Sequence, residues 1–158
     1  MKTKDAAEAF LGHRRIAVTG VSRRAEGHGS NAVYQRLRER GYEVYAINPS
    51  GQEVEGDPSY PTLADVPGGV EAVVIATSPA HARDTMEQCI DLGIGFVWMH
   101  SAFGAGSVSE EAAALGRQHG ILVIDGACPL MFEPTADGFH KAMCRALTLA
   151  GRLPRTVS

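Results

Sequence analysis

Short apolar runs alternate with amphipathic segments along the whole chain. Five of these runs have the length of buried strands, and they cover residues 16–18, 43–47, 72–76, 96–99 and 121–124. Between them, apolar residues recur at helical spacing in residues 31–40, 79–92 and 109–119. Strands that alternate with helices in this way predict an α/β fold whose sheet is parallel and whose connections are right-handed.

Smaller elements complete the predicted order. Residues 3–12 carry Ala6, Ala7, Phe10 and Leu11 at helical spacing, which predicts a short leading helix. Residues 49–61 are rich in Gly, Pro, Ser and Asp and indicate a surface loop with a short strand at Glu53–Val54, followed by one helical turn at residues 62–67. We expect Ser30 to cap the helix at 31–40 and Ser109 to open the helix at 109–119.

The terminal helix, predicted over about residues 137–150, has an apolar stripe. The stripe consists of Phe139, Met143, Ala146, Leu147 and Ala150. Packing on the sheet is the default interpretation of such a stripe, and a seam with a second copy of the chain is the alternative.

Composition limits the classes of function. The chain has 158 residues, 44% of them hydrophobic and 21% charged, which is typical of one soluble globular domain. The formal net charge of −3 gives no support to broad nucleic-acid binding. Positive potential must therefore be local, and a candidate cluster is formed by Arg14, Arg15, Arg23 and Arg24.

The cysteine pattern and the chain start indicate a cytoplasmic protein. Cys89, Cys128 and Cys144 form no C-x-x-C pair and have no His at zinc spacing, so we expect neither a disulfide framework nor a metal site. The first residues lack the apolar segment of a signal peptide, and no apolar run reaches the length of a membrane span.

In open parallel sheets, ligands bind beyond the carboxyl ends of the strands, where the strand order reverses. This rule selects five segments: Gly20–Arg24, Ile47–Ser50, Thr77–Pro79, Met99–Ser101 and Asp125–Pro129. A dinucleotide site would need G-x-G-x-x-G after the first strand, whereas Gly20 is followed by Val21 and Ser22. It would also need an acidic residue after the second strand, where this chain has Asn48 and Pro49. Two independent features therefore disfavour NAD.

The first turn suits phosphate in another way. Ser22 offers a hydroxyl, and Arg23 and Arg24 offer forked donors that match phosphate oxygens. Ser30 and Asn31 stand where a helix N-terminus adds its N–H groups. The alternative is that the two arginines form only a solvated loop.

Two other strand ends also allow either a ligand contact or a purely structural role. Asn48 and Pro49 can meet an adenine or ribose edge, or can simply form a turn. Thr77, Ser78 and Pro79 form a helix cap, and the cap hydroxyls face the same crevice.

Taken together, these segments resemble the CoA-binding domain family, which includes the CoA-binding domain of the succinyl-CoA synthetase α subunit. The resemblance covers roughly residues 10–130 and lies in the segments IAVTGVSRR (16–24), GYEVYAINP (41–49), YPTLADVP (60–67), AVVIATSP (72–79), FVWMHSAFG (96–104) and ILVIDGACP (121–129). It is strongest to small stand-alone members. It implies a Rossmann-like three-layer α/β fold, with a five-stranded, mainly parallel sheet, helices on both faces and a single domain over residues 1–158.

The resemblance also implies ligand contacts. CoA phosphates would be contacted by Gly20, Ser22, Arg23 and Arg24, the adenosine part by Asn48 and Pro49, and the pyrophosphate or pantetheine arm by Thr77, Ser78 and Pro79. The loop Ala25–Gly29, with His28, departs from the proline-containing stretch of the family.

Other side chains near the predicted crevice have less specific signals. Met99, His100 and Phe103 lie beside it, and His100 lacks a placed partner for base catalysis. Cys128 stands where the resemblance would aim the CoA thiol and could exchange with a CoA disulfide, but a packed cysteine is the favoured interpretation.

The sequence thus predicts non-catalytic or accessory binding of coenzyme A or an acyl-CoA. One alternative is an NAD(P)-dependent oxidoreductase with an atypical phosphate loop. Another is the CoA-binding subunit of a two-part acyl-CoA ligase. The expected partner is a small CoA ligand, without nucleic acid or membrane, and a homodimer remains open.

Overall fold

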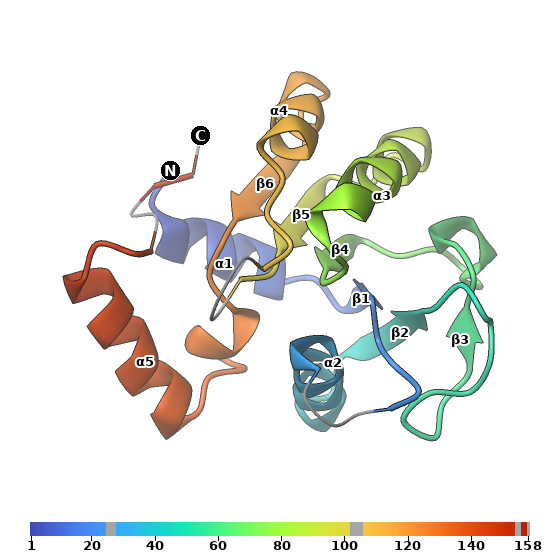
Figure 1. The fold of residues 1–158 in the computed structure, drawn as a ribbon, viewed down its shortest axis with the longest axis horizontal. Helices are drawn as coiled ribbons and strands as arrows, with labels where there is room; N and C mark the ends of the chain where they lie inside the picture. Colours follow the sequence, from blue (N-terminus) through green and yellow to red (C-terminus); the bar gives the residue numbers. More distant parts are fainter. Residues whose placement is uncertain (25–27, 102–105, 154–155, 158) are drawn as a thin grey trace.

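A single parallel sheet organises the molecule (Figure 1). The computed structural model describes residues 1–24, 28–101, 106–153 and 156–157. Within them, six strands lie in the order β3-β2-β1-β4-β5-β6, and every pairing is parallel. Their bounds are β1 Arg15–Thr19, β2 Glu43–Ile47, β3 Ser59–Tyr60, β4 Ala72–Ile75, β5 Phe96–Met99 and β6 Leu122–Asp125. The Rossmann-like α/β fold is confirmed, with six strands where the sequence indicated five.

The additional strand lies in the loop after β2. β3 is only two residues long and pairs with Ala46 and Ile47 of β2. The strand expected at Glu53–Val54 is wrong, since Val54 forms only an isolated bridge with Asp57. Two residues are too few to show the alternation of apolar and polar side chains that marks a strand in a sequence. The sequence therefore did not indicate β3.

The helices form two layers around the sheet (Figure 1). Their bounds are α1 Thr3–Leu11, α2 Gly29–Glu39, α3 Pro79–Asp91, α4 Glu110–Gln118 and α5 Gly138–Leu149, with 3₁₀ turns η1 Leu63–Asp65 and η2 Pro129–Met131. Side chains alternate between the faces of each strand, so each layer receives every second residue. Ile16, Val74 and Trp98 join the cluster that contains α1, α2 and η2 residues, whereas Ala17 and Val73 join the α3–α4 cluster.

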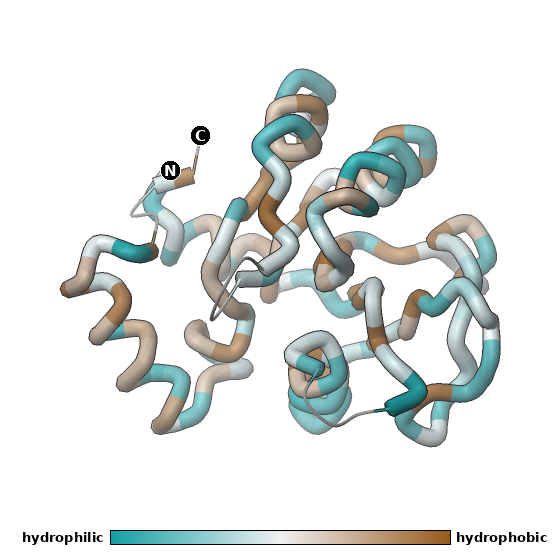
Figure 2. The backbone as a smooth tube through the Cα atoms, in the orientation of Figure 1, coloured by the Kyte–Doolittle hydropathy of each residue, from teal (hydrophilic) through white to brown (hydrophobic). Residues whose placement is uncertain are grey.

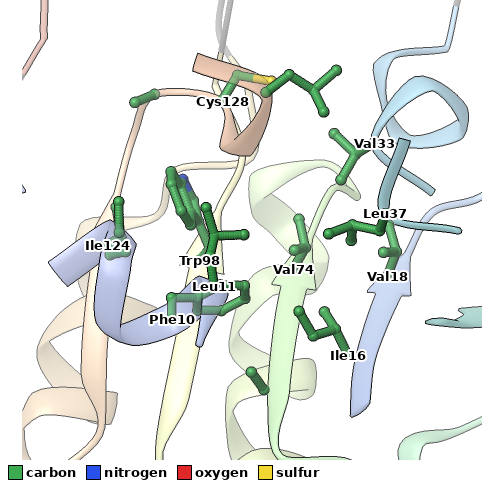
Figure 3. Packing of buried hydrophobic residues seen from close by; sticks show 14 of the residues in the cluster. Phe10, Leu11, Ile16, Val18, Val33, Leu37, Val74, Trp98, Ile124 and Cys128 are labelled. Carbon is green, nitrogen blue, oxygen red and sulfur yellow. The ribbon is translucent and has the colours of Figure 1, made fainter. Parts of the chain in front are cut away.

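Trp98 anchors the first of these clusters. It is fully buried, its ring lies edge-on to Phe10 at 5.3 Å between centroids, and its Nε1 donates to the Gly126 carbonyl at 2.9 Å. Figure 3 shows Phe10 and Trp98 beside Ile124, with Leu37 on the far side of Val74. Trp98 is therefore a core residue.

Helix ends follow local chemistry. Ser109 caps α4, because its hydroxyl accepts from the N–H of Ala112 at 3.2 Å. The expected cap at Ser30 is wrong: α2 begins at Gly29 with His28 as its N-cap, and His28 makes no side-chain cap bond. Ser30 therefore lies in the first turn of α2.

The two chain ends lie close together, and α5 stands at the margin of the molecule (Figure 1). Met1 and Val157 exchange two backbone hydrogen bonds, with the terminal amine donating at 3.2 Å and the Val157 N–H at 2.9 Å. Among the described residues, no helix is both long and apolar enough to cross a membrane.

The strand order reverses between β1 and β4. From β1 the chain proceeds outward through β2 to β3, and after η1 it returns to β4 and continues outward through β5 to β6. The carboxyl ends of β1 and β4 are therefore neighbours, and the segments that follow them lie where ligands bind in open parallel sheets.

Candidate ligand site at the strand ends

Gly20 allows the ends of β1 and β4 to approach each other. Its φ is +74°, and a Cβ placed there would lie 2.6 Å from the carbonyl oxygen of Ala76. The side chain of Thr19 adds a tie, because its hydroxyl accepts from the Ala76 N–H at 3.1 Å. A side chain at position 20 would need both a strained backbone and wider strand ends. The first predicted site residue thus has a clear geometric role.

Asn31 holds the turn after β1 in place. Its Oδ1 accepts from the Ser22 N–H at 2.9 Å, and its Nδ2 donates to the Ser22 carbonyl at 2.8 Å. The same Nδ2 donates to Glu55 Oε1 at 2.7 Å. Ser30 ties the beginning of the same turn, since its hydroxyl donates to the Gly20 carbonyl at 2.8 Å. Both side chains are buried, so they shape the turn while their backbone N–H groups remain available at the start of α2.

The charged part of this turn is exposed. Arg23 and Arg24 are both exposed, and neither forms an ion pair with another described residue. The hydroxyl of Ser22 accepts from the Arg24 N–H at 3.1 Å and rounds off the turn. Residues 25–27 of the predicted AEGHG loop lie outside the described residues. Two exposed cationic side chains thus belong to the turn that leads toward α2, whose N-cap residue His28 makes no side-chain cap bond. The amino end of a helix favours anions.

Arg14 and Arg15 do not belong to this charge cluster. Arg15 lies at the amino end of β1, donates to the Gly69 carbonyl at 2.9 Å and forms an ion pair with Glu43. The backbone N–H groups of Arg14 and Arg15 both donate to Glu71 at 2.9 Å. The four-arginine cluster is therefore wrong. β1 lies between the two pairs, and it spans about 13 Å from Arg15 to Thr19 at roughly 3.3 Å per residue.

At the end of β2, the Asn48 side chain is used within the protein. Its Nδ2 donates to the Val21 carbonyl at 2.9 Å, which links β2 to the first turn. Its Oδ1 accepts from the N–H and the hydroxyl of Ser50 at 2.9 and 2.8 Å. Pro49 is exposed beside it. The turn interpretation accounts for these bonds, and contact of Asn48 or Pro49 with a ligand stays a prediction.

The end of β4 contains an unpaired hydroxyl. Thr77 Oγ1 is inaccessible to solvent and has no hydrogen-bond partner among the described residues. The backbone N of Thr77 lies 3.2 Å from the position that a Cβ on Gly20 would take, so Thr77 stands at the reversal point. Ser78 is the N-cap of α3 without a side-chain cap bond, and Pro79 is its first residue. A buried unpaired hydroxyl fits a site that a polar ligand completes.

At the end of β5, His100 faces the start of α2. A Cβ on Gly29 would lie 3.1 Å from Cε1 of the His100 ring. Burial, and next the proximity of His140, lower the pKa of His100 below its usual value. Met99 is fully buried in the α3–α4 cluster, so a ligand contact at this position would have to come from its backbone. Phe103 lies outside the described residues.

Cys128 is packed rather than exposed. It follows β6, caps η2 and retains only 2% of its accessible surface. Burial raises the pKa of its thiol to about 12, and the Leu130 N–H only partly offsets this. Figure 3 shows Cys128 above the core, on the side nearer to Val33. A protonated, buried thiol is a poor nucleophile for disulfide exchange.

Two groups were missed from sequence. Asp137 caps α5 and accepts from Nδ1 of His140 at 2.8 Å, and Arg36 of α2 donates to the same carboxylate at 3.2 Å. These bonds, led by the His140 N–H, lower the pKa of Asp137. Glu55, with φ at +52°, braces Asn31 from the β2–β3 loop. The Asp137–His140 pair is local to the start of α5, but the contacts of Asp137 with Arg36 and of Glu55 with Asn31 join segments far apart in sequence and carry no local motif.

No group of three or more potential metal-ligating side chains gathers within the described ranges. A cavity of about 590 Å³ lies away from the strand ends, between α1 and α5. It is lined by Lys2, Thr3, Lys4, Glu8, Met131, Phe132, Glu133, Cys144, Thr148 and Leu153. None of the predicted site residues is among them.

Comparison with known proteins matches the part of the chain that contains the sheet and its strand ends. Residues 14–134 match the model of the family described as CoA binding domain. The chain is 29% identical over 126 residues to the acetate–CoA ligase [ADP-forming] II subunit alpha of Pyrococcus furiosus, covering 75% of this chain and 27% of that protein. It thus spans about a quarter of the length of that relative.

Shorter relatives are also similar. The uncharacterized protein YneT of Bacillus subtilis is 26% identical over 115 residues, which cover 73% of this chain and 82% of that protein. Among solved structures, a hypothetical protein from Pyrococcus horikoshii OT3 superposes with a TM-score of 0.74 at 28% identity. That similarity covers 82% of this chain and 88% of the other.

Proposed function

The chain belongs to the CoA binding domain family, and from this premise we propose that it binds coenzyme A or an acyl-CoA in the strand-end crevice. The family match over residues 14–134 is the observation that carries the proposal. It begins just before β1 and ends just after η2, so it contains all six strands and every predicted site residue. The part of the chain that the family shares is therefore the part that forms the crevice.

The chemistry of the crevice supports a phosphorylated ligand. Arg23 and Arg24 supply exposed positive charge, and the amino end of α2 supplies N–H donors beside it. Thr77 supplies a hydroxyl that lacks a partner among the described residues. CoA carries phosphates for the first two groups and amide and hydroxyl groups for the third. We assign phosphate contact to the arginines and the α2 terminus on this basis.

We propose an accessory binding role rather than covalent chemistry at Cys128. The thiol is buried and its pKa is raised, so it is protonated at neutral pH. All three cysteines are free thiols, and a cytoplasmic location, in which thiols stay reduced, is part of the proposal. CoA would then be carried or sensed, and any reaction would take place on a partner.

Titration calorimetry with CoA tests the proposal. We expect binding by the wild type, and a loss of about tenfold or more in the Arg23→Ala/Arg24→Ala variant, with a weaker salt dependence. The matched control is Arg40→Ala/Arg152→Ala, which removes two exposed arginines away from the crevice. Absence of heat with CoA, or equal losses in both variants, would refute the assignment. Parallel thermal-shift measurements with NAD and NADP test the oxidoreductase alternative through ligand stabilisation.

A second candidate function is the CoA-binding subunit of a two-part acyl-CoA ligase. The similarity to a ligase α subunit, of which this chain spans only 27%, favours it. The similarity to YneT and to the Pyrococcus horikoshii protein over most of their lengths favours a binding protein that acts alone. Affinity purification from the native host distinguishes them, because a stoichiometric nucleotide-binding subunit would be recovered only in the first case.

A further inference from the structure

The outward face of α5 carries an apolar stripe that the described part of the chain leaves uncovered. Of the stripe predicted from sequence, Met143 and Leu147 face inward, because Met143 is 9% exposed and both belong to or pack against the α1–α2 cluster. Phe139 and Leu149, at the two ends of the helix, are 70% and 89% exposed. Brown segments recur along the whole of α5 in Figure 2. A helix that packs on one side only would show charge on the other.

The spacing of the exposed residues is that of a helix–helix seam. Phe139, Ala142, Ala146 and Leu149 follow one another at intervals of three, four and three residues, and all four are exposed. This is the a/d pattern by which two helices pack. Ala150 extends the exposed stripe, while the charged side chains Lys141 and Arg145 lie to one flank of it.

The order of large and small residues fits a second copy of the same helix. Bulky residues stand at both ends and alanines in the middle, so the stripe is complementary to itself when two copies run antiparallel. Phe139 then meets Leu149 of the other copy, and Ala142 meets Ala146 at the close crossing. A two-fold pair of this kind uses one surface twice and closes without forming a chain of subunits.

A groove borders the exposed stripe at Leu149, on the flank that carries Lys141 and Arg145. It has a volume of about 450 Å³ and is lined by Met131, Lys141, Cys144, Arg145, Thr148 and Leu149. In the antiparallel arrangement, Phe139 of the other copy lies near Leu149, which forms one border of this groove. Phe139 and Leu149 lie about 15 Å apart along α5 at roughly 1.5 Å per residue.

We propose that α5 is a homodimer interface, in which two copies pack antiparallel through Phe139, Ala142, Ala146 and Leu149. One helix face buries less than the roughly 800 Å² per partner of a standard interface, so the dimer is expected to be weak, with a dissociation constant of about 1–100 μM. α5 begins after residue 134, where the family match ends. The proposal does not depend on the CoA ligand.

Sedimentation equilibrium of the full chain across about 1–300 μM tests the proposal, since that range brackets the expected constant. We expect the wild type to pass from monomer to dimer, and Ala146→Glu to remain monomeric. Ala114→Glu is the matched control, because it places the same charge on an exposed alanine of α4. A monomeric wild type at every concentration, or equal dimerisation of wild type and Ala146→Glu, would overturn the proposal.

The antiparallel register has its own test. Ala142→Lys and Ala146→Glu should each dissociate the homodimer, because each places an unpaired charge in the seam. An equimolar mixture of the two variants should recover a heterodimer, since the ammonium introduced by the first substitution would face the carboxylate introduced by the second. Circular dichroism of each variant verifies folding. Failure of the mixture to associate beyond its components would exclude this register.

Discussion

Asn31→Ala should both destabilise the protein and loosen the turn after β1. The substitution removes hydrogen bonds to the N–H and carbonyl of Ser22 and to Glu55. At about 1 kcal/mol each, less about 0.5 kcal/mol for the better helix propensity of Ala, the free energy of unfolding should fall by about 2–3 kcal/mol. Because the Ser22 backbone loses its clamp, CoA affinity should fall about tenfold or more.

Gln35→Ala is the matched control for this prediction. Gln35 donates to the same Glu55 carboxylate, at 2.7 Å, and lies one helical turn beyond Asn31, away from the Ser22 backbone. It should cost about 1 kcal/mol or less and leave CoA affinity unchanged. Urea denaturation gives the two free energies, and calorimetry gives the two affinities. If Asn31→Ala unfolds at the same urea concentration as Gln35→Ala, or binds CoA as tightly, the clamp does not organise the site.

The clamp also has a pH signature. Hydrogen bonds from Asn31, then Gln35, hold the pKa of Glu55 below its usual 4.5. A carboxylate with a lowered pKa contributes stability above its unfolded pKa and loses it as pH falls through the folded value. Wild-type stability should therefore decline below pH 4.5, and Asn31→Ala should decline less steeply there. An unchanged slope in the variant would argue against this coupling.

The remaining predictions address other parts of the crevice. Gly20→Ala should lower the free energy of unfolding by at least about 1–2 kcal/mol, because φ is +74° and the new Cβ would meet a carbonyl oxygen at the end of β4. An unchanged midpoint of urea denaturation would contradict this. Thr77→Val should change the free energy of unfolding by less than about 0.5 kcal/mol, since the Thr77 hydroxyl is unpaired among the described residues. The same variant should bind CoA more weakly in calorimetry. Unchanged affinity would remove Thr77 from the site. Burial lowers the pKa of His100 below 6.5, so wild-type stability should fall as pH drops from 6.5 through the folded value, and His100→Gln should lack this decline. Cys128 should react with a thiol reagent only on unfolding, because its pKa is about 12, whereas the less buried Cys144 should react in the native state; rapid labelling of native Cys128 would contradict its packing.

The strand ends could be predicted from sequence because they depend on local order. Alternating apolar runs locate the strands, and parallel pairing places their carboxyl ends at one edge of the sheet. The same reasoning could have separated Arg15 from Arg23, since a strand lies between them. Arg15 and Arg23 are close in sequence but lie toward opposite ends of β1.

Other features depend on tertiary contacts that a single sequence does not encode locally. Glu55 reaches Asn31 from 24 positions away, through a loop whose conformation includes a left-handed residue. The stripe on α5 was found by its spacing, but which part of it faces the core depends on how the helix docks. The structure turns Met143 inward and leaves Phe139 outside.

The side chains chosen as ligand contacts divide into two kinds in the structure. Ser30, Asn31 and Asn48 spend their polar atoms on the backbone of the turn after β1. Arg23 and Arg24 stay exposed beside it. Recognition of a phosphorylated ligand would then rest on a fixed set of backbone donors together with exposed positive charge. Substitution of the first kind should alter stability and affinity together, whereas substitution of the arginines should alter affinity and its salt dependence alone.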